Sequence, residues 1–314
     1  MNNEEKIMLY RNIKKIVDLN YNFVKHKADY VSNLNSYKFS SIHETDSFTI
    51  KEMYDTFEPV FVLSTGRTGT KFSSLLLNKS KLVDSYHEPE PSLQHFCDFA
   101  YHNQKQSLTL NKMFDAARME LILNTYIKNK IYVETNQCMA FYAPEISKLF
   151  KRSKFVHLKR HPGDFTRSAI RKGWYKSDSI WESGRIKMND EKHWSNMGQV
   201  EKLGWLWTAT NEFIEDFQKT IAPSRMVSIK MEEMTTDPEK VLELFNFVGV
   251  HDVSKDGILK MQKKKVNEPV VRIKESPNIK KVKDFPKYND WDLTMKEQFK
   301  LYTKDLAERY GYAL

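Results

Sequence analysis

A glycine-containing turn between two apolar segments is the first place in this sequence where residue types and spacing suggest chemistry. Residues 60–77 read VFVLSTGRTGTKFSSLLL, with Gly66 and Gly69 in the turn. The pattern predicts a strand, a tight loop and a helix that begins near Thr70. Because the amides at a helix start point toward an anion, the loop is a candidate phosphate-binding site.

This loop does not have the spacing of a Walker A nucleotide-binding motif. That motif requires GxxxxGK[ST], in which lysine directly follows the second glycine. Here Gly69 comes three residues after Gly66, and Lys71 follows Thr70. The spacing therefore argues against a kinase that uses this motif.

A second strand-to-helix turn carries an arginine and a serine. Residues 154–170 read KFVHLKRHPGDFTRSAI, which predicts a strand ending at Arg160, a His-Pro-Gly turn and a helix that bears Ser168. An arginine fork offers paired donors to a phosphate, and the helix can bring the serine hydroxyl to the same anion. The sequence thus contains two candidate phosphate sites.

Between the two turns, the segment 86–91, YHEPEP, contains two candidate general bases, His87 and Glu88. A carboxylate suits this task when partial desolvation raises its pKa toward working pH, whereas an imidazole titrates near neutrality without a shift. A metal site at His87, Glu88 and His95 would lack a recognisable ligand spacing, so no metal is predicted.

These motifs together resemble those of the PAPS-dependent sulfotransferases, which use 3′-phosphoadenosine 5′-phosphosulfate (PAPS) as sulfuryl donor. In that family a basic residue, a small residue, Gly and Thr follow the first strand, as in 67–70, RTGT. An arginine at a strand end is followed eight positions later by serine, as Arg160 is by Ser168. The resemblance covers about residues 58–312 and is closest in motif style to bacterial and to carbohydrate- or tyrosyl-protein-type enzymes.

The resemblance implies a metal-independent enzyme that releases adenosine 3′,5′-bisphosphate (PAP), and it implies roles for individual residues. Arg67 would hold the phosphosulfate, and Arg160 with Ser168 would bind the 3′-phosphate. Glu88, which is 21 positions beyond Arg67 (88 − 67), would remove the acceptor proton, with His87 as the rival base. The other implied donor contacts are Gly66, Thr68, Gly69, Thr70, Lys71 and Phe72 of the loop, and Lys265 and Arg272 of a basic segment near the C-terminus.

An aromatic-rich stretch, residues 173–199, is the candidate acceptor lid, because aromatic rings among polar residues can stack on a sugar or another ring. Trp205 and Trp207, on the next predicted helix, are expected in the core. The expected acceptor contacts are Glu88, Thr135, Asn136, Trp174, Tyr175 and Trp181. The acceptor class stays open between a glycan and a small-molecule metabolite.

Strand and helix patterns alternate along the chain. Besides 60–63, runs rich in β-branched residues predict strands at 131–133, 154–158 and 226–229. Helical periodicity covers 111–128, 141–149, 162–172, 200–219 and 238–247. The alternation predicts an α/β fold, a mostly parallel central sheet flanked by helices on both faces, and the resemblance places it among P-loop nucleoside-triphosphate-hydrolase-like folds.

Capping signals delimit some of these helices. Asp237-Pro238 predicts an N-cap followed by a first-turn proline. Thr294 and Glu297 have the spacing of a capping box that opens the last helix, and Gly311 is a stop signal.

The chain is expected to have two parts. Residues 1–57 form a helical extension, in which apolar spacing over 5–34 predicts one or two amphipathic helices through which the protein could form a homo-oligomer. Residues 58–314 form the sulfotransferase domain.

Bulk properties limit the partners and the location. The formal net charge of +9 favours an anionic partner. No apolar run approaches the roughly 18 residues of a membrane span, and no signal peptide is recognised, so the expected location is the cytoplasm. Cys97 and Cys138 form no CxxC pair and are expected to be buried, unpaired packing residues in a reducing compartment.

Two other functions remain open on sequence grounds. One is a P-loop-type small-molecule kinase that uses ATP and magnesium, although it lacks the Walker A pair. The other is a non-catalytic binder of nucleotides or nucleic acid, suggested by the charge and the lysines of 258–283. No RNA-binding motif or helix-turn-helix signature is present, so no nucleic-acid partner is predicted.

Overall fold

The computed structural model describes residues 47–176, 182, 184–263 and 285–314. The chain divides into two compact units, Met1–Thr49 and Ile50–Leu314. The helices expected over 5–34 lie outside the described residues. The domain boundary at 57/58 and the oligomer through those helices therefore stay predictions.

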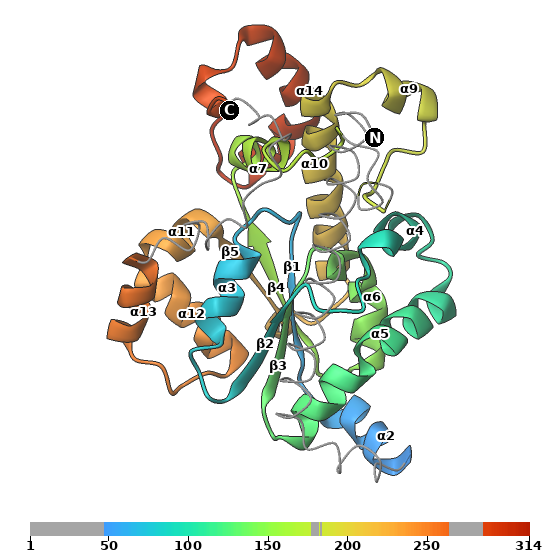
Figure 1. Ribbon diagram of the computed structural model, residues 1–314, viewed down its shortest axis with the longest axis vertical. Coiled ribbons are helices and arrows are strands. Elements are labelled where there is room, and N and C mark those ends of the chain that lie inside the picture. Colours follow the sequence, from blue (N-terminus) through green and yellow to red (C-terminus); the bar gives the residue numbers. More distant parts are fainter. Residues whose placement is uncertain (1–46, 177–181, 183, 264–284) are drawn as a thin grey trace, which may run out of the picture. The chain divides into compact units, whose positions relative to one another are not determined.

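A five-stranded, fully parallel sheet forms the centre of the second unit (Figure 1). The strand order is β2-β3-β1-β4-β5, which confirms the predicted parallel sheet. All five carboxyl ends lie at one edge, where open α/β sheets bind their ligands. The strands are β1 (Val60–Leu63), β2 (Val83–His87), β3 (Ile131–Thr135), β4 (Lys154–Lys159) and β5 (Met226–Lys230).

Four of these strands match the predicted runs, but β2 was not predicted. Among its side chains only Val83 is buried, so β2 has no apolar run for a sequence pattern to detect. The register of the parallel pair places His87 opposite Thr135 at the end of β3. An edge strand thus carries one of the candidate bases.

Helices cover both faces of the sheet, as predicted. Val60 and Val62 belong to a core cluster that includes residues of helices α3 and α12. Phe61 points the other way, and its ring centroid lies 5.8 Å from that of Phe114 on helix α5. The main covering helices are α3 (Thr70–Leu77) and α12 (Pro238–Val248) on one side and α5 (Ser107–Ile127), α6 (Met139–Leu149) and α10 (Gln199–Gln218) on the other (Figure 1).

The remaining helices surround this core. Gly204 of α10 lies against Phe299 and Thr303 of α14, where an added Cβ would approach Phe299 to 3.0 Å. Trp207 is fully buried as predicted, while Trp205 is partly exposed. These helices are α2 (Ser47–Thr56), α4 (Cys97–His102), α7 (Pro162–Ile170), α9 (Glu191–Asn196), α11 (Met231–Thr236), α13 (Lys255–Lys263) and α14 (Leu293–Arg309), with short 3-10 turns at Gln94–Phe96, Pro223–Arg225 and Tyr288–Asp290.

Of the two N-cap predictions, the one for α12 is confirmed and the one for α14 is wrong. Asp237 caps α12 as expected by accepting a hydrogen bond from the Glu239 amide at 2.9 Å. The capping box at Thr294 was wrong, because Asp292 caps α14 and accepts from the Met295 amide at 2.7 Å. Aspartate is an equally strong N-cap residue, so the helix begins earlier than the Thr294 pattern predicted.

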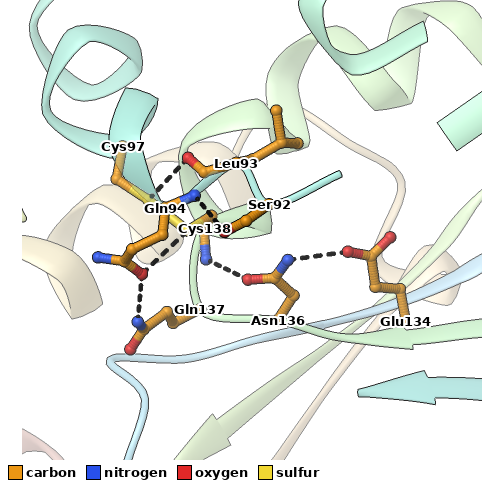
Figure 2. Close-up of a disulfide and its surroundings, with 8 residues drawn as sticks. All are labelled: Ser92, Leu93, Gln94, Cys97, Glu134, Asn136, Gln137 and Cys138. Atoms are coloured by element: carbon orange, nitrogen blue, oxygen red, sulfur yellow. Dashed lines mark hydrogen bonds between the residues drawn. A yellow bond between two sulfur atoms is a disulfide. The ribbon is translucent and has the colours of Figure 1, made fainter. Parts of the chain in front are cut away.

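The prediction of two unpaired thiols was also wrong. Cys97 and Cys138 are buried, as expected, but they form a disulfide with a Cα–Cα distance of 5.5 Å (Figure 2). Cys97 begins α4 and Cys138 precedes α6, and these two helices contact each other. The pairing depends on this helix contact, which a separation of 41 residues does not reveal.

In the part of the chain that the structure describes, no helix has both the length and the apolar character needed to cross a membrane.

Candidate active site

A cavity of about 910 Å³ lies at the carboxyl ends of the central strands and brings together residues from distant parts of the sequence. Its walls include both predicted phosphate turns and the segment that contains the two candidate bases. The predicted site residues that line it are Arg67, Gly69, Thr70, Lys71, Phe72, His87, Glu88, Asn136, Arg160, Ser168 and Trp174.

The first loop has a backbone that requires glycine. Gly66 and Gly69 have φ angles of +75° and +81°, in the left-handed region that glycine adopts without steric cost. A Cβ on Gly66 would lie 1.9 Å from the side-chain oxygen of Gln137, and one on Gly69 would lie 2.1 Å from the sulfur of Met231. The loop is therefore held closely between its neighbours.

Helix α3 follows this loop and begins at Thr70, as predicted. No side chain caps its N-terminus, where Gly69 is the N-cap residue. The amides of the first turn of a helix have no partners within the helix, and the helix dipole favours negative charge there. This end of α3 lines the cavity and suits an anion.

The two phosphate turns meet through Arg67. Its Nε donates a hydrogen bond to Ser168 Oγ at 3.1 Å, and Arg160 Nη1 donates to the Arg67 carbonyl oxygen at 2.6 Å. The turns are adjacent because β1 and β4 are neighbouring strands, so both chains leave the sheet side by side. Arginine, arginine and serine thus converge at one point of the cavity.

The charge of the cavity is predominantly positive. Burial, followed by the neighbouring Arg160, lowers the pKa of Arg67, and Glu88 partly offsets them. The basic residues of the wall are Arg67, Lys71, Arg160, Lys172 and Arg185, against the carboxylates of Glu88 and Glu90. A site with this excess of positive charge favours an anionic ligand.

The segment 86–91, which contains the two candidate bases and is called the base segment below, is bound to the end of strand β3. The Glu88 amide donates to the Thr135 carbonyl oxygen at 3.2 Å, and His87 Nδ1 lies 3.1 Å from both the carbonyl and the hydroxyl oxygen of Thr135. Thr135 is itself fully buried and does not line the cavity. It therefore holds the base segment in place, whereas it was expected to contact the acceptor.

Adjacent aromatic residues of the expected acceptor lid have different surroundings. Trp174 lines the cavity, and the Arg185 guanidinium lies 3.6 Å from the centroid of its indole ring. Arg185 is held in turn by Glu182, with an Nη2–Oε1 distance of 3.0 Å. Tyr175 does not line the cavity, because its hydroxyl donates to the Ile186 carbonyl oxygen and its ring packs edge-on against Trp194.

The other predicted site residues lie elsewhere. Gly66 and Thr68 are buried and do not line the cavity, and the Thr68 hydroxyl has no hydrogen-bond partner among the described residues. Trp181, Lys265 and Arg272 lie outside the described residues.

Several cavity residues were not predicted from the sequence. Lys172 lies in the turn just after α7, four positions beyond Ser168, and the helix predicted over 162–172 would have placed it near that serine. Arg185 has no local signal, because only the fold brings it to Trp174. Gln94 and Gln137 are linked across the cavity wall by a 2.6 Å hydrogen bond from Gln137 Nε2 to Gln94 Oε1.

No group of three His, Cys, Asp or Glu side chains with metal-binding geometry occurs among residues 47–176, 182, 184–263 and 285–314. His95, once considered with His87 and Glu88, is not part of the cavity wall.

A parallel sheet whose central strand leads through a glycine loop into a helix, beside a second basic turn, is an arrangement typical of α/β proteins that bind nucleotide phosphates. A model of the sulfotransferase family matches residues 59–252, more than half of the chain. The chain belongs to the sulfotransferase family, and its class of activity is sulfuryl transfer.

Solved structures that are similar to this chain include sulfotransferases. The sulfotransferase domain from the curacin biosynthetic pathway is 16% identical, with 83% of this chain and 99% of that chain covered and a TM-score of 0.48. The sulfotransferase domain from the Synechococcus PCC 7002 olefin synthase is 18% identical, with 82% of this chain and 97% of that chain covered and a TM-score of 0.44. Mouse sulfotransferase SULT7A1, complexed with PAP, is 14% identical, with 85% of this chain and 94% of that chain covered and a TM-score of 0.44.

A comparison with curated protein sequences gave no match. The family assignment rests on the match over residues 59–252.

Proposed function

We propose that this sulfotransferase moves the sulfuryl group of PAPS to a hydroxyl of a glycan or small-molecule metabolite and releases PAP. The observation that supports this most strongly is the convergence of Arg67, Arg160 and Ser168 in one cavity. PAPS carries anionic groups at both its 5′ and 3′ positions. A cavity with two neighbouring anion sites suits such a donor better than one with a single phosphate loop.

The residues present fit this donor. The uncapped N-terminus of α3, with Arg67 and Lys71, would hold the 5′-phosphosulfate, and Arg160 with Ser168 would hold the 3′-phosphate. After the larger effect of burial, the charge of Arg160 lowers the pKa of Arg67, and this supports the assignment, since a bound anion would offset the repulsion that Arg67 experiences. When bound, PAPS supplies the sulfuryl group that is transferred.

Glu88 is the proposed general base. Its carboxylate belongs to the cavity wall and is near enough to Arg67 to raise the pKa of that guanidinium, although burial and Arg160 have larger, opposite effects. The backbone bond from Glu88 to Thr135 holds the segment in position. Glu88 would accept the proton of the acceptor hydroxyl while Arg67 and the α3 amides neutralise charge on the departing phosphate side.

Calorimetric titration of the magnesium-free protein with PAP, with ATP as the comparison ligand, tests the donor assignment. We expect PAP to bind in preference to ATP and Arg160→Ala to weaken PAP binding. A preference for ATP with magnesium would overturn the proposal and support the small-molecule kinase instead. Binding of oligonucleotides with steep salt dependence, without PAP binding, would support the non-catalytic binder.

A further inference from the structure

A buried ion pair joins helix α5 to strand β3, one hydrogen bond away from Asn136 in the cavity wall. Arg118 of α5 and Glu134 of β3 both have 0% of their side chains exposed, and Arg118 Nε donates to Glu134 Oε2 at 2.7 Å. Neither residue is part of the cavity wall. Any effect of this pair on the reaction must therefore act through other residues.

Arg118 holds the far end of the base segment. Its Nη1 donates to the Pro91 carbonyl oxygen at 2.9 Å, three residues beyond Glu88 (91 − 88). At the near end, the Glu88 amide donates to the Thr135 carbonyl oxygen at 3.2 Å. The segment is thus held at one end by the backbone of β3 and at the other by a side chain from α5.

Glu134 links the same arginine to the cavity wall. Its Oε1 accepts a hydrogen bond from Asn136 Nδ2 at 2.9 Å, and Asn136 Oδ1 accepts from the Cys138 amide at 3.0 Å (Figure 2). Asn136 and Cys138 both line the cavity. One carboxylate therefore joins the wall at the end of β3 to the arginine that holds the base segment.

A buried pair of charges such as Arg118 and Glu134 need not stabilise the fold. Removing two charges from water is costly, and a buried ion pair often contributes no more stability than well-packed apolar residues of similar size. Burial, the largest single effect, lowers the pKa of Arg118, but Glu134 together with smaller effects of Tyr132 and Glu90 more than offsets it, so the pKa is raised and the guanidinium stays charged. Besides a bond to the Ala117 carbonyl oxygen of its own helix, Arg118 donates to the segment that carries Glu88 and to the strand that Asn136 follows.

We infer that Arg118 and Glu134 are positioning residues, which hold the Glu88 segment and Asn136 in fixed relation in the cavity wall; this rests on the proposed role of Glu88 as base. The pair sets the rate at which Glu88 accepts a proton and has little effect on the donor site. Small misplacements of a reacting group lower rates strongly even when binding persists.

The test uses the full chain with PAPS as donor and water as acceptor, so that no acceptor has to be known. The water oxygen forms the new bond to sulfur, the bond from sulfur to the bridging oxygen breaks, and PAP leaves with that oxygen. Glu88 takes the water proton and passes it to solvent, and sulfate is the second product. The rate of PAP release is measured together with the calorimetric affinity for PAP.

The main variant is Arg118→Met with Glu134→Gln, which removes the ion pair without leaving a buried charge unpaired. Arg118→Lys keeps a positive charge opposite Glu134 and serves both as the conservative comparison and as the test variant if the double variant does not fold. The matched control is Arg225→Lys, because Arg225 also donates to backbone carbonyl oxygens, at Ser153 and Phe150, but at the amino ends of the strands.

We expect the double variant to release PAP about 10- to 100-fold more slowly, with an unchanged PAP affinity, and Arg118→Lys to recover part of the rate. Arg225→Lys should keep the wild-type rate. In a Glu88→Gln background the double variant should cause little further loss, because residues that act through one group have non-additive effects.

An unchanged rate in the double variant, or the same fold loss with and without Glu88, would overturn the positioning role. Either result with normal PAP binding would leave the donor assignment intact. A wild-type protein that does not bind PAP would instead refute the proposed function, and the positioning role with it.

Discussion

Arg67 and Ser168 are 101 positions apart in the chain and are joined by a hydrogen bond of 3.1 Å from Nε to Oγ. Arg67 leaves the carboxyl end of β1, and Ser168 lies on the helix that follows β4. The bond therefore connects the two turns that were each predicted to bind a phosphate. Its position inside a positively charged cavity leads directly to a prediction about nucleotide specificity.

Ser168→Ala should weaken PAP binding selectively. A hydrogen bond to a charged group contributes about 1.5–3 kcal/mol, so we expect a loss of about tenfold or more in PAP affinity. Binding of adenosine 5′-monophosphate, which has no 3′-phosphate, should not change. Calorimetry with both nucleotides checks this, and Ser195→Ala is the control because Ser195, which does not line the cavity, donates to the Glu191 carbonyl oxygen within α9. Equal weakening of both nucleotides would contradict a 3′-phosphate site at Ser168.

Glu88→Gln and His87→Gln should separate the two candidate bases. General base catalysis typically contributes about 10²–10⁴-fold, so we expect a loss of that order in sulfuryl transfer for Glu88→Gln and a smaller loss for His87→Gln. Neither change should abolish PAP binding. PAP release from PAPS provides the rate. A larger loss for His87→Gln would assign the base to the imidazole.

Gly66→Ala should disrupt the first phosphate loop. The added methyl group meets the Gln137 side-chain oxygen at 1.9 Å and occupies a residue with φ of +75°, so it combines a collision with backbone strain. Gly249→Ala separates the two effects, because Gly249 has φ of +95° but its nearest neighbour would be Ile131 at 3.7 Å. We expect Gly249→Ala to cost about 1–2 kcal/mol of unfolding free energy and keep PAP binding.

For Gly66→Ala the expected result is loss of PAP binding, because Gln137 cannot withdraw without breaking its bond to Gln94. Urea unfolding and PAP calorimetry on both variants provide the comparison. Wild-type PAP affinity in Gly66→Ala would show that the loop does not need its observed backbone.

Reduction of the Cys97–Cys138 disulfide should destabilise the protein. A cross-link between residues 41 positions apart restricts the unfolded chain, and disulfides typically contribute about 2–4 kcal/mol. We expect a reductant to lower the unfolding free energy of the wild type by about this amount. The double variant Cys97→Ser with Cys138→Ser should be insensitive to reductant. If the urea midpoint of the wild type does not change with reductant, the Cys97–Cys138 disulfide is contradicted.

His157 should make the protein less stable in mild acid. Its Nε2 donates to Asn211 Oδ1 at 2.8 Å, and its buried Nδ1 has no partner among the described residues. Burial and, secondarily, Lys159 lower the pKa of His157 to about 3. In the unfolded chain the imidazole has a pKa near 6.5, so the unfolded state binds more protons than the folded state between about pH 3 and 6.5. The free energy of unfolding therefore falls by up to about 1.4 kcal/mol for each pH unit below 6.5.

The comparison is between wild type and His157→Gln in urea unfolding at several pH values from 7 to 5. The variant should lose less unfolding free energy over this range, because it lacks the titrating imidazole. Parallel curves for the two proteins would show that His157 does not carry the effect.

Local sequence patterns determined much of the framework. The apolar run at Val60, the helix start at Thr70 and the strand leading to Arg160 were all predicted, because burial of consecutive side chains and the conformations of glycine act over only a few residues. The same patterns did not reveal β2, whose edge position buries only Val83. Asp292 caps the last helix ahead of the predicted Thr294, because neighbouring cap signals compete.

Contacts between distant segments were decided by tertiary structure. The strand order placed Arg67 beside Ser168, and the approach of α4 to α6 joined Cys97 to Cys138. Trp174 and Tyr175 are neighbours of similar type, yet only Trp174 lines the cavity. The sequence by itself determined which residues can be charged, which can accept a proton and where glycine allows unusual backbone angles. Strand order and helix packing decided which of these residues share a site. The order and the packing depend on interactions across the whole core, which no short stretch of sequence contains.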